Sequence, residues 1–178
     1  MKKITAILCI LFCTVHALAQ NYTAADAGSA IKFNIKNLGL NVTGSFKGLK
    51  GKINFDPSNL AAASVSVSVD ASTINTGNNS RDKHLKKQDY FDVSNYPLLS
   101  FVSTKITGGA GVFQIEGSLT IKGVSKAISF PFTAKQEGNA YRFTGQFSIN
   151  RRNFNVGGSS WVLSDNLIVS LNVLTVKE

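Results

Sequence analysis

Apolar and polar residues alternate along most of this chain. The segment IKFNIKN, residues 31–37, puts its apolar side chains on one face and its polar side chains on the other, and SVSVSVD, residues 64–70, alternates valine with serine or aspartate. The same period recurs in FQIEGSLTIK, YRFTGQFSIN and LIVSLNV, which begin at residues 113, 141 and 167. This period of two predicts antiparallel strands with one apolar face and one face in water.

Short turn motifs separate these segments. Residues 56–59 (DPSN), 108–111 (GGAG), 122–123 (KG) and 137–139 (EGN) supply the backbone conformations that tight reversals need. About eight to ten strands with short connections indicate an all-β barrel or sandwich in one domain.

One connection, residues 75–96, is much longer than the others. A structureless loop of that length would be unusual in a compact domain. We expect a short helical segment near residues 80–88, with Ser80 as its N-cap and Asp82 in its first turn, where an acidic side chain is favourable. The segment is expected to cover one mouth of the sheet structure.

Three predicted strands carry a glycine on their apolar face, at Gly44, Gly117 and Gly145. Glycine lets a strongly coiled sheet bend at a barrel corner. It also leaves interior volume that a ligand could occupy. The sequence alone leaves both interpretations open.

The first 19 residues have the features of a secretory signal. Lys2 and Lys3 precede a short apolar core, residues 4–12, and Ala17-Leu18-Ala19 fits the small-x-small cleavage pattern. We therefore expect a signal peptide over residues 1–19, a single domain over residues 20–178, and export to the periplasm or out of the cell.

Removal of this segment would limit the side chains that the exported protein has for catalysis or metal binding. Cys9, Cys13 and His16 all lie within it, so the exported chain would have no thiol and a single histidine, His84. A disulfide framework, a thiolate site and a multi-histidine metal site are thereby excluded, and we expect no metal and no cofactor. Removing Lys2 and Lys3 from the 19 basic residues leaves 17 against 10 acidic ones, a net charge of +7.

Four stretches together resemble the YceI-like family of exported bacterial proteins. They are NLGLNVTGSFKGLKGKINFD from residue 37, the block from Val69 to Ile106, GSLTIKGVSKAISFPF from residue 117, and INRRNFNVG from residue 149. The resemblance implies a single lipocalin-like antiparallel β-barrel with a helical segment near one mouth. It also implies binding of a long isoprenoid or related lipid in the barrel lumen, without catalysis. The chain departs from the family pattern at residues 21–30 and 159–161.

Residues at the alternating apolar positions are the candidates for the lumen wall. A small barrel encloses either packed side chains or one elongated ligand, and each buried methylene of a ligand contributes about 0.8 kcal/mol. Residues alone do not separate a cavity from a filled core, but the resemblance favours a cavity. The predicted ligand-binding residues are Phe33, Phe46, Val67, Leu85, Tyr90, Phe91, Phe101, Phe113, Ile115, Phe130, Phe143, Phe147 and Trp161.

The charged stretch RDKHLKKQDYFD, residues 81–92, is the only concentration of candidate chemistry. A serine hydrolase would need His84 between a carboxylate and a serine, but no Gly-x-Ser-x-Gly motif is present, and Asp82 and His84 would not share a helix face. We interpret the stretch as a gate whose apolar residues cover the mouth. Its Arg81 and His84, together with Arg151, are the candidate contacts for a lipid headgroup.

Other function classes remain as alternatives. A lipid hydrolase using His84 and an envelope protein with a filled core and protein partners are the two that we retain. The scattered lysines and predicted export argue against nucleic acid as a partner and favour an anionic membrane surface. The oligomeric state, a homodimer included, is left open by the sequence.

Overall fold

The computed structural model describes residues 21–178. The predicted signal peptide lies outside these described residues. Eight strands are present: β1 (Asn21–Asn37), β2 (Leu40–Asn54), β3 (Ser64–Asn75), β4 (Leu98–Gly109), β5 (Val112–Ile121), β6 (Val124–Glu137), β7 (Ala140–Asn150) and β8 (Leu163–Lys177). Three short helices accompany them: the α-helix α1 (Asn79–Leu85) and the 3₁₀ helices η1 (Leu60–Ala62) and η2 (Arg151–Phe154).

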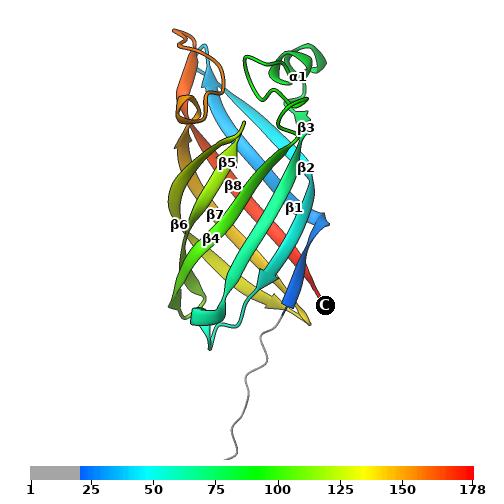
Figure 1. Cartoon of the computed structure of the whole chain (residues 1–178), viewed down its shortest axis with the longest axis vertical. Helices are drawn as coiled ribbons and strands as arrows, with labels where there is room; N and C mark the ends of the chain where they lie inside the picture. Colours follow the sequence, from blue (N-terminus) through cyan, green and yellow to red (C-terminus); the bar gives the residue numbers. More distant parts are fainter. Residues whose placement is uncertain (1–20) are drawn as a thin grey trace, which may run out of the picture.

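Each strand pairs antiparallel with the next, and β1 also pairs with β8, which closes the sheet into a barrel. The predicted all-β fold, a single antiparallel barrel of about eight strands with one short helical segment, is confirmed. Figure 1 shows α1 and the β7–β8 connection at one end of the barrel, which we call the helix end. We call the opposite end, where η1 and both ends of the described chain lie, the closed end.

Strand β1 is irregular where the sequence pattern is loose. Its pairing with β2 shifts between Thr23 and Ile31, and Gly28 adopts a φ of 81°. Side chains replace the missing ladder bonds: the N–H of Leu49 donates to Asp26 Oδ1 at 2.8 Å, and the N–H of Leu174 donates to Ser29 Oγ at 2.8 Å. The departure from alternation at residues 21–30 is thus a bulge that bends the strand around the barrel.

Helix α1 differs in its boundaries from the prediction. It begins at Asn79 and ends at Leu85, and its N-cap is Asn78, whose side chain accepts a hydrogen bond from the N–H of Arg81 at 3.0 Å. Ser80 lies inside the first turn, so the predicted cap was wrong; asparagine caps a helix as well as serine does. Within residues 21–178, no helix has both the length and the apolar character needed to cross a bilayer.

The three interior glycines make room for aromatic rings. A Cβ on Gly44 would lie 2.2 Å from Cζ of Phe33, the residue paired with it on β1, and a Cβ on Gly117 would lie 2.5 Å from Cζ of Phe101 on β4. Around Gly145 the nearest atoms belong to Pro131, Phe132 and Phe130, at 3.2–3.4 Å. The space left by Gly44 and Gly117 is therefore occupied by phenylalanine rings from neighbouring strands, an arrangement known from other sheets, and does not itself hold a ligand.

We expect Gly117→Ala to lower the free energy of unfolding by about 1–3 kcal/mol. Its Cβ would lie 2.5 Å from the carbonyl oxygen of Val102, a backbone atom that cannot rotate away. Urea unfolding followed by circular dichroism measures the change. Gly109→Ala is the control, because nothing lies within 4 Å of its Cβ, and its effect should stay below about 0.5 kcal/mol. Equal effects of the two substitutions would contradict the close approach of β4 to Gly117.

Candidate functional site

The barrel encloses a cavity of about 260 Å³ whose wall is almost entirely apolar. Inward-facing residues of the strands and the segment that follows α1 form this wall. Eleven of the predicted lining residues border it: Phe33, Phe46, Val67, Leu85, Tyr90, Phe91, Phe101, Ile115, Phe130, Phe143 and Phe147. Their contact with a ligand stays a prediction.

Several inward side chains keep exposed surface although they point into the barrel. Phe143 and Phe147 on β7 and Val169 and Leu171 on β8 are only half-buried, and all four border the cavity. Their outward neighbours, such as Ser170, face the solvent outside. The exposed surface of the inward set therefore faces the cavity, and the lumen is hollow rather than filled by side chains.

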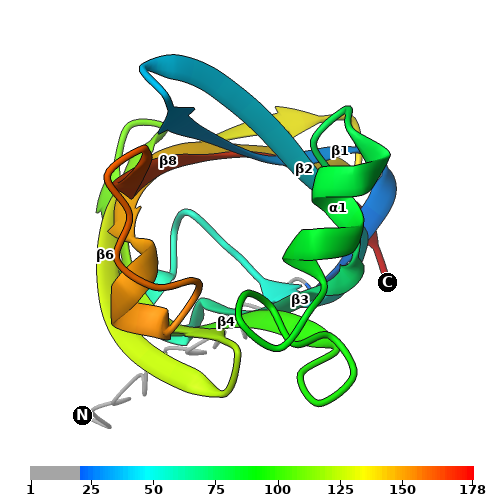
Figure 2. The same ribbon diagram turned by 90° about the horizontal axis from the view of Figure 1, so that it is seen from above.

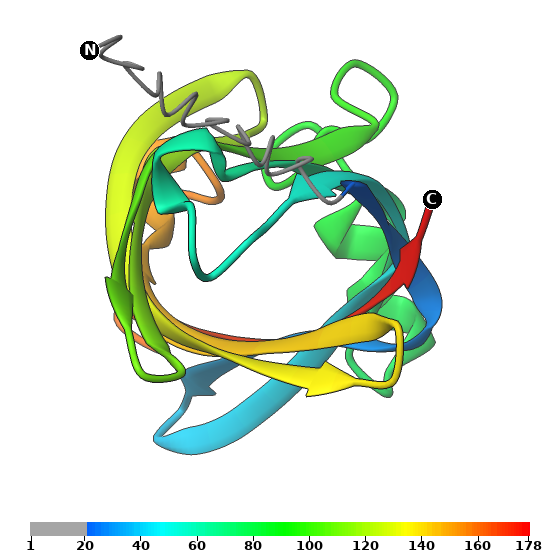
Figure 3. The ribbon, with the colours of Figure 1, turned by 90° about the horizontal axis from the view of Figure 1, so that it is seen from below.

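An aromatic cluster forms the floor of the cavity. Phe55, 1% exposed, follows β2, and the link from β2 to β3 runs across the closed end of the barrel (Figure 3). Its ring centroid lies 5.1 Å from that of Phe143, 5.2 Å from that of Phe113 and 5.3 Å from that of Tyr141. Edge-on ring pairs of this kind pack tightly and exclude water.

Phe113 belongs to this floor and does not line the cavity, which corrects its predicted place in the wall. It is 3% exposed and stacks on Phe132 at 5.3 Å. Tyr22 also lies here, and its pKa is raised by burial and, to a smaller extent, by Tyr141 and Asp56. The phenol therefore stays neutral well beyond neutral pH, which keeps the floor uncharged.

The cavity reaches the helix end, where α1 lies (Figure 2): Arg81 of α1 and Phe91 of the segment after it both border the cavity. We call this part of the cavity its mouth. Phe91 packs edge-on against Phe46 at 5.5 Å, and Arg81, Leu85 and Tyr90 border the same region as half-buried side chains. Leu85, Tyr90 and Phe91 are the apolar residues that the sequence predicted as a gate, and Arg81 is one of the predicted headgroup contacts.

Arg81 is held by the end of β3. Its Nε donates to Thr76 Oγ1 and its Nη2 to the carbonyl oxygen of Thr76, both at 2.7 Å, while Asp82 accepts from the N–H and the hydroxyl of Thr76 at 2.9 and 2.6 Å. Arg81 forms no ion pair with any residue from 21 to 178, and its Nη1 has no acceptor among them. The guanidinium therefore borders the cavity mouth with donors left for a polar ligand group.

His84 lies outside the cavity, contrary to its prediction as a headgroup contact. Its ring packs edge-on against Tyr90 at a centroid distance of 4.9 Å and is exposed on the outer side of α1. In the described part of the chain no serine or carboxylate forms a hydrogen bond with it. The helix turns this side chain outward, while Leu85 faces the lumen.

Residues 22–174 match the sequence model of the YceI-like domain. The chain belongs to this family. A UPF0312 protein of Yersinia enterocolitica is 31% identical over 156 residues, which cover 83% of this chain and 81% of that protein.

Solved structures agree with the barrel. BcnA of Burkholderia cenocepacia superposes with a TM-score of 0.80 at 28% identity, covering 85% of this chain and 98% of BcnA. The YceI protein of Campylobacter jejuni gives 0.69 at 25% identity, covering 100% and 99%. A polyisoprenoid binding domain from Saccharophagus degradans gives 0.72 over 88% of this chain and 98% of that domain; at 16% identity it supports the fold alone.

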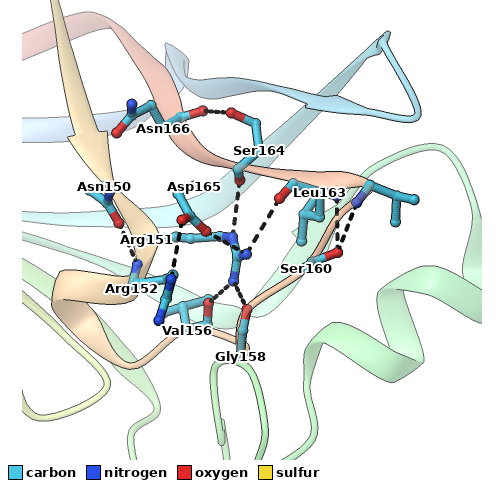
Figure 4. A network of polar contacts seen from close by, with 11 residues as sticks. Asn150, Arg151, Arg152, Val156, Gly158, Ser160, Leu163, Ser164, Asp165 and Asn166 are labelled. Carbon is cyan, nitrogen blue, oxygen red and sulfur yellow. Dashed lines mark hydrogen bonds and ion pairs between the residues drawn. The ribbon is translucent and has the colours of Figure 1, made fainter.

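Arg151 of this YceI-like chain is a structural residue of the β7–β8 connection (Figure 4). It is 3% exposed, and η2 begins at it, so it does not simply continue β7. Nε donates to the carbonyl of Ser164, Nη1 to the carbonyls of Val156 and Gly158, and Nη2 to Asp165 at 2.8 Å and the carbonyl of Leu163. All five donors are engaged, so its predicted role as a headgroup contact is corrected although it borders the cavity.

Trp161 is the clearest error among the predicted lining residues. Its side chain is fully exposed, at 105%, and it does not border the cavity. It precedes β8 in a turn where Ser160 Oγ accepts from the N–H groups of Val162 and Leu163 at 3.3 and 3.0 Å. Outside a strand, alternation no longer decides which way a side chain points.

The described residues offer no metal site. No group of three or more histidine, cysteine, aspartate or glutamate side chains is close enough to hold an ion anywhere in residues 21–178.

Phe55 is the functional candidate that the prediction missed. It was detectable, because Phe55 follows Ile53 by two residues and so continues the inward phase of β2 one residue beyond the end of the strand.

Proposed function

We propose that this protein binds a long apolar lipid, of isoprenoid or fatty-acyl type, in the barrel lumen and stores or carries it without catalysis. The single observation that carries the proposal is a hollow, apolar cavity inside a closed barrel, with its mouth beside α1. A tail that replaces water along this wall gains about 0.8 kcal/mol per buried methylene, so few polar contacts are needed. Membership of the YceI-like family and the fold shared with a polyisoprenoid binding domain support it.

The ends of the cavity suggest the ligand's orientation. The floor around Phe55 is aromatic and uncharged, which suits the apolar terminus of a chain. The mouth holds Arg81, whose free donors suit a carbonyl, carboxylate or phosphate group. We further propose that the protein acts in the periplasm or outside the cell, on the basis of the signal-like residues 1–19. No observation favours the hydrolase alternative, because His84 lies outside the cavity.

The proposal is tested by native purification, solvent extraction and mass spectrometry. We expect about one lipid per protein, and we expect Val169→Trp to reduce it to less than about a tenth, because the larger side chain fills the lumen. Val169 borders the cavity, whereas its neighbour Ile168 is 44% exposed on the outer face, so Ile168→Trp is the matched control and should keep its lipid. Thermal unfolding of both variants checks that they fold.

The outcomes separate the alternatives. If neither native protein nor protein incubated with fatty acids or polyprenols retains a lipid, the proposal fails. It also fails if Val169→Trp and Ile168→Trp lose lipid equally. Turnover of an added lipid that His84→Ala abolishes would establish the hydrolase instead.

A further inference from the structure

Four large apolar side chains are exposed together at the helix end of the barrel. Leu38 is 72% exposed, Leu40 73%, Trp161 105% and Val162 48%. They occupy two tips, the β1–β2 turn and the segment just before β8. The two tips adjoin, because the N–H of Leu38 donates to the carbonyl of Val162 at 2.8 Å. We call these four residues the rim patch; Figure 1 shows its two tips beside each other at the top of the barrel.

The conformation of Leu38 makes the patch unfavourable for an isolated domain. The two turn residues have positive φ, 51° at Leu38 and 78° at Gly39, which a tight hairpin turn requires. Asparagine, aspartate and glycine adopt this conformation most readily, and a leucine there is strained. The two other tight turns of this kind have Ala110 and Lys122 at the same position. The exposed Leu38 side chain therefore contributes little burial to the fold of the isolated domain and remains available for an external contact.

Positive charge is concentrated at the same end. The charged residues of the helix end lie in its four connections (38–39, 76–97, 122–123 and 151–162) and in the three strand residues on either side of each. Nine are basic and four are acidic, a net charge of +5, whereas the remaining described residues contribute +2. The basic set is Lys36, Arg81, Lys83, Lys86, Lys87, Lys122, Lys126, Arg151 and Arg152, and the acidic set is Asp82, Asp89, Asp92 and Asp165.

We propose that the rim patch docks this protein on an anionic lipid bilayer, with the cavity mouth facing the membrane. The β1–β2 turn, the β7–β8 connection and α1 lie around the same end of the barrel (Figure 2), the end at which Arg81 and Phe91 border the cavity. A surface laid across this end would meet the apolar tips and the exposed Lys83 and Lys87 together. Tryptophan and leucine favour the headgroup boundary, and each nearby lysine attracts anionic lipid.

Membrane docking would serve the lipid binding proposed above, and its biological purpose rests on that proposed function. A lipid tail that leaves the bilayer at the docked mouth enters the lumen without crossing water. Docking itself does not require a loaded lumen. The lumen-filled variant Val169→Trp is therefore expected to bind vesicles as the native protein does, so docking and lipid binding can fail separately.

The test uses residues 21–178, which contain all eight strands of the closed barrel, and vesicles of phosphatidylcholine with or without phosphatidylglycerol. Trp161 is the single tryptophan of the chain, so the tryptophan fluorescence of the protein reports on the surroundings of this residue alone. We expect its emission to shift to shorter wavelength with phosphatidylglycerol vesicles, less so with phosphatidylcholine alone, and the shift to weaken as salt is added. Co-sedimentation measures the partition coefficient.

Leu38→Asn is the decisive variant, because asparagine suits the turn and should fold at least as well. We expect it to lower the partition coefficient about tenfold, with Val112→Ser as the control; Val112 is 58% exposed at the closed end and its loss should have no effect. The proposal is overturned if the native protein does not bind phosphatidylglycerol vesicles, or if Leu38→Asn and Val112→Ser bind them equally. It is also overturned if sedimentation shows a dimer that Leu38→Asn dissociates and no vesicle binding, since a second copy would then cover the patch.

Discussion

Arg151→Met is expected to lower the free energy of unfolding by about 3–5 kcal/mol. The substitution removes five N–H donors from a buried site and leaves the carbonyl oxygens of Ser164, Val156, Gly158 and Leu163 without them. Val156 is buried, so its carbonyl oxygen bears the full cost of desolvation once it loses its donor, and the half-buried Leu163 and Ser164 bear part of that cost. Asp165 loses the closer of its two arginine partners as well. Thermal and urea unfolding measure the effect.

The adjacent arginine provides the matched control. Arg152 also pairs with Asp165, at 3.4 Å, but its side chain is 49% exposed. An exposed ion pair contributes little, so Arg152→Met should cost less than about 1 kcal/mol. Arg151→Lys should fall between the two, since an ammonium has three donors and cannot reproduce the planar fork. Equal effects of Arg151→Met and Arg152→Met would show that the network does not hold this connection.

The strands were predictable because one face of each strand is apolar and points into the barrel, away from the solvent. Once the apolar face is assigned, alternation fixes the direction of every side chain in the strand, and the inward series of β5 and β7 follows from the sequence alone. Most of the strands and most of the residues of the cavity wall come from this rule. Alternation alone left a barrel and a sandwich open, and the resemblance to the YceI-like family favoured the barrel and its cavity. The bulge in β1 breaks the rule, because Asp26 and Ser29 provide hydrogen bonds that no pattern of apolar residues reveals.

The errors cluster where strands end. Trp161, His84 and Arg151 lie in connections at the helix end, where side-chain direction depends on local hydrogen bonds rather than on periodicity. Phe113 lies in a strand and does point inward, but alternation carries no information on depth along the barrel axis. The position of the floor is set by the β2–β3 link. Phe55, at the start of this link, borders the cavity and packs against Phe113, so Phe113 becomes part of the floor.

Phe55→Ala is the second large effect that we expect, a loss of about 3–5 kcal/mol of unfolding free energy. Four rings surround Phe55: Phe143, Phe113 and Tyr141 at 5.1–5.3 Å, and Phe132 at 6.3 Å. A cavity in so enclosed a site cannot collapse fully, so the lost transfer free energy and the cavity cost add. Urea unfolding provides the measurement.

The same substitution should change what the lumen holds, because Phe55 limits its depth. If the ligand's apolar terminus rests on this floor, the lipid extracted from Phe55→Ala should be longer than that from the native protein. Phe91→Ala is the control: Phe91 is half-buried at the mouth, its ring meets Phe46 at 5.5 Å, and its loss should cost about half as much or less. Phe91→Ala should leave the length of the bound lipid chain unchanged, since Phe91 lies at the mouth and does not limit the depth of the cavity. A Phe55→Ala protein with native stability and the native lipid would show that the cavity ends elsewhere.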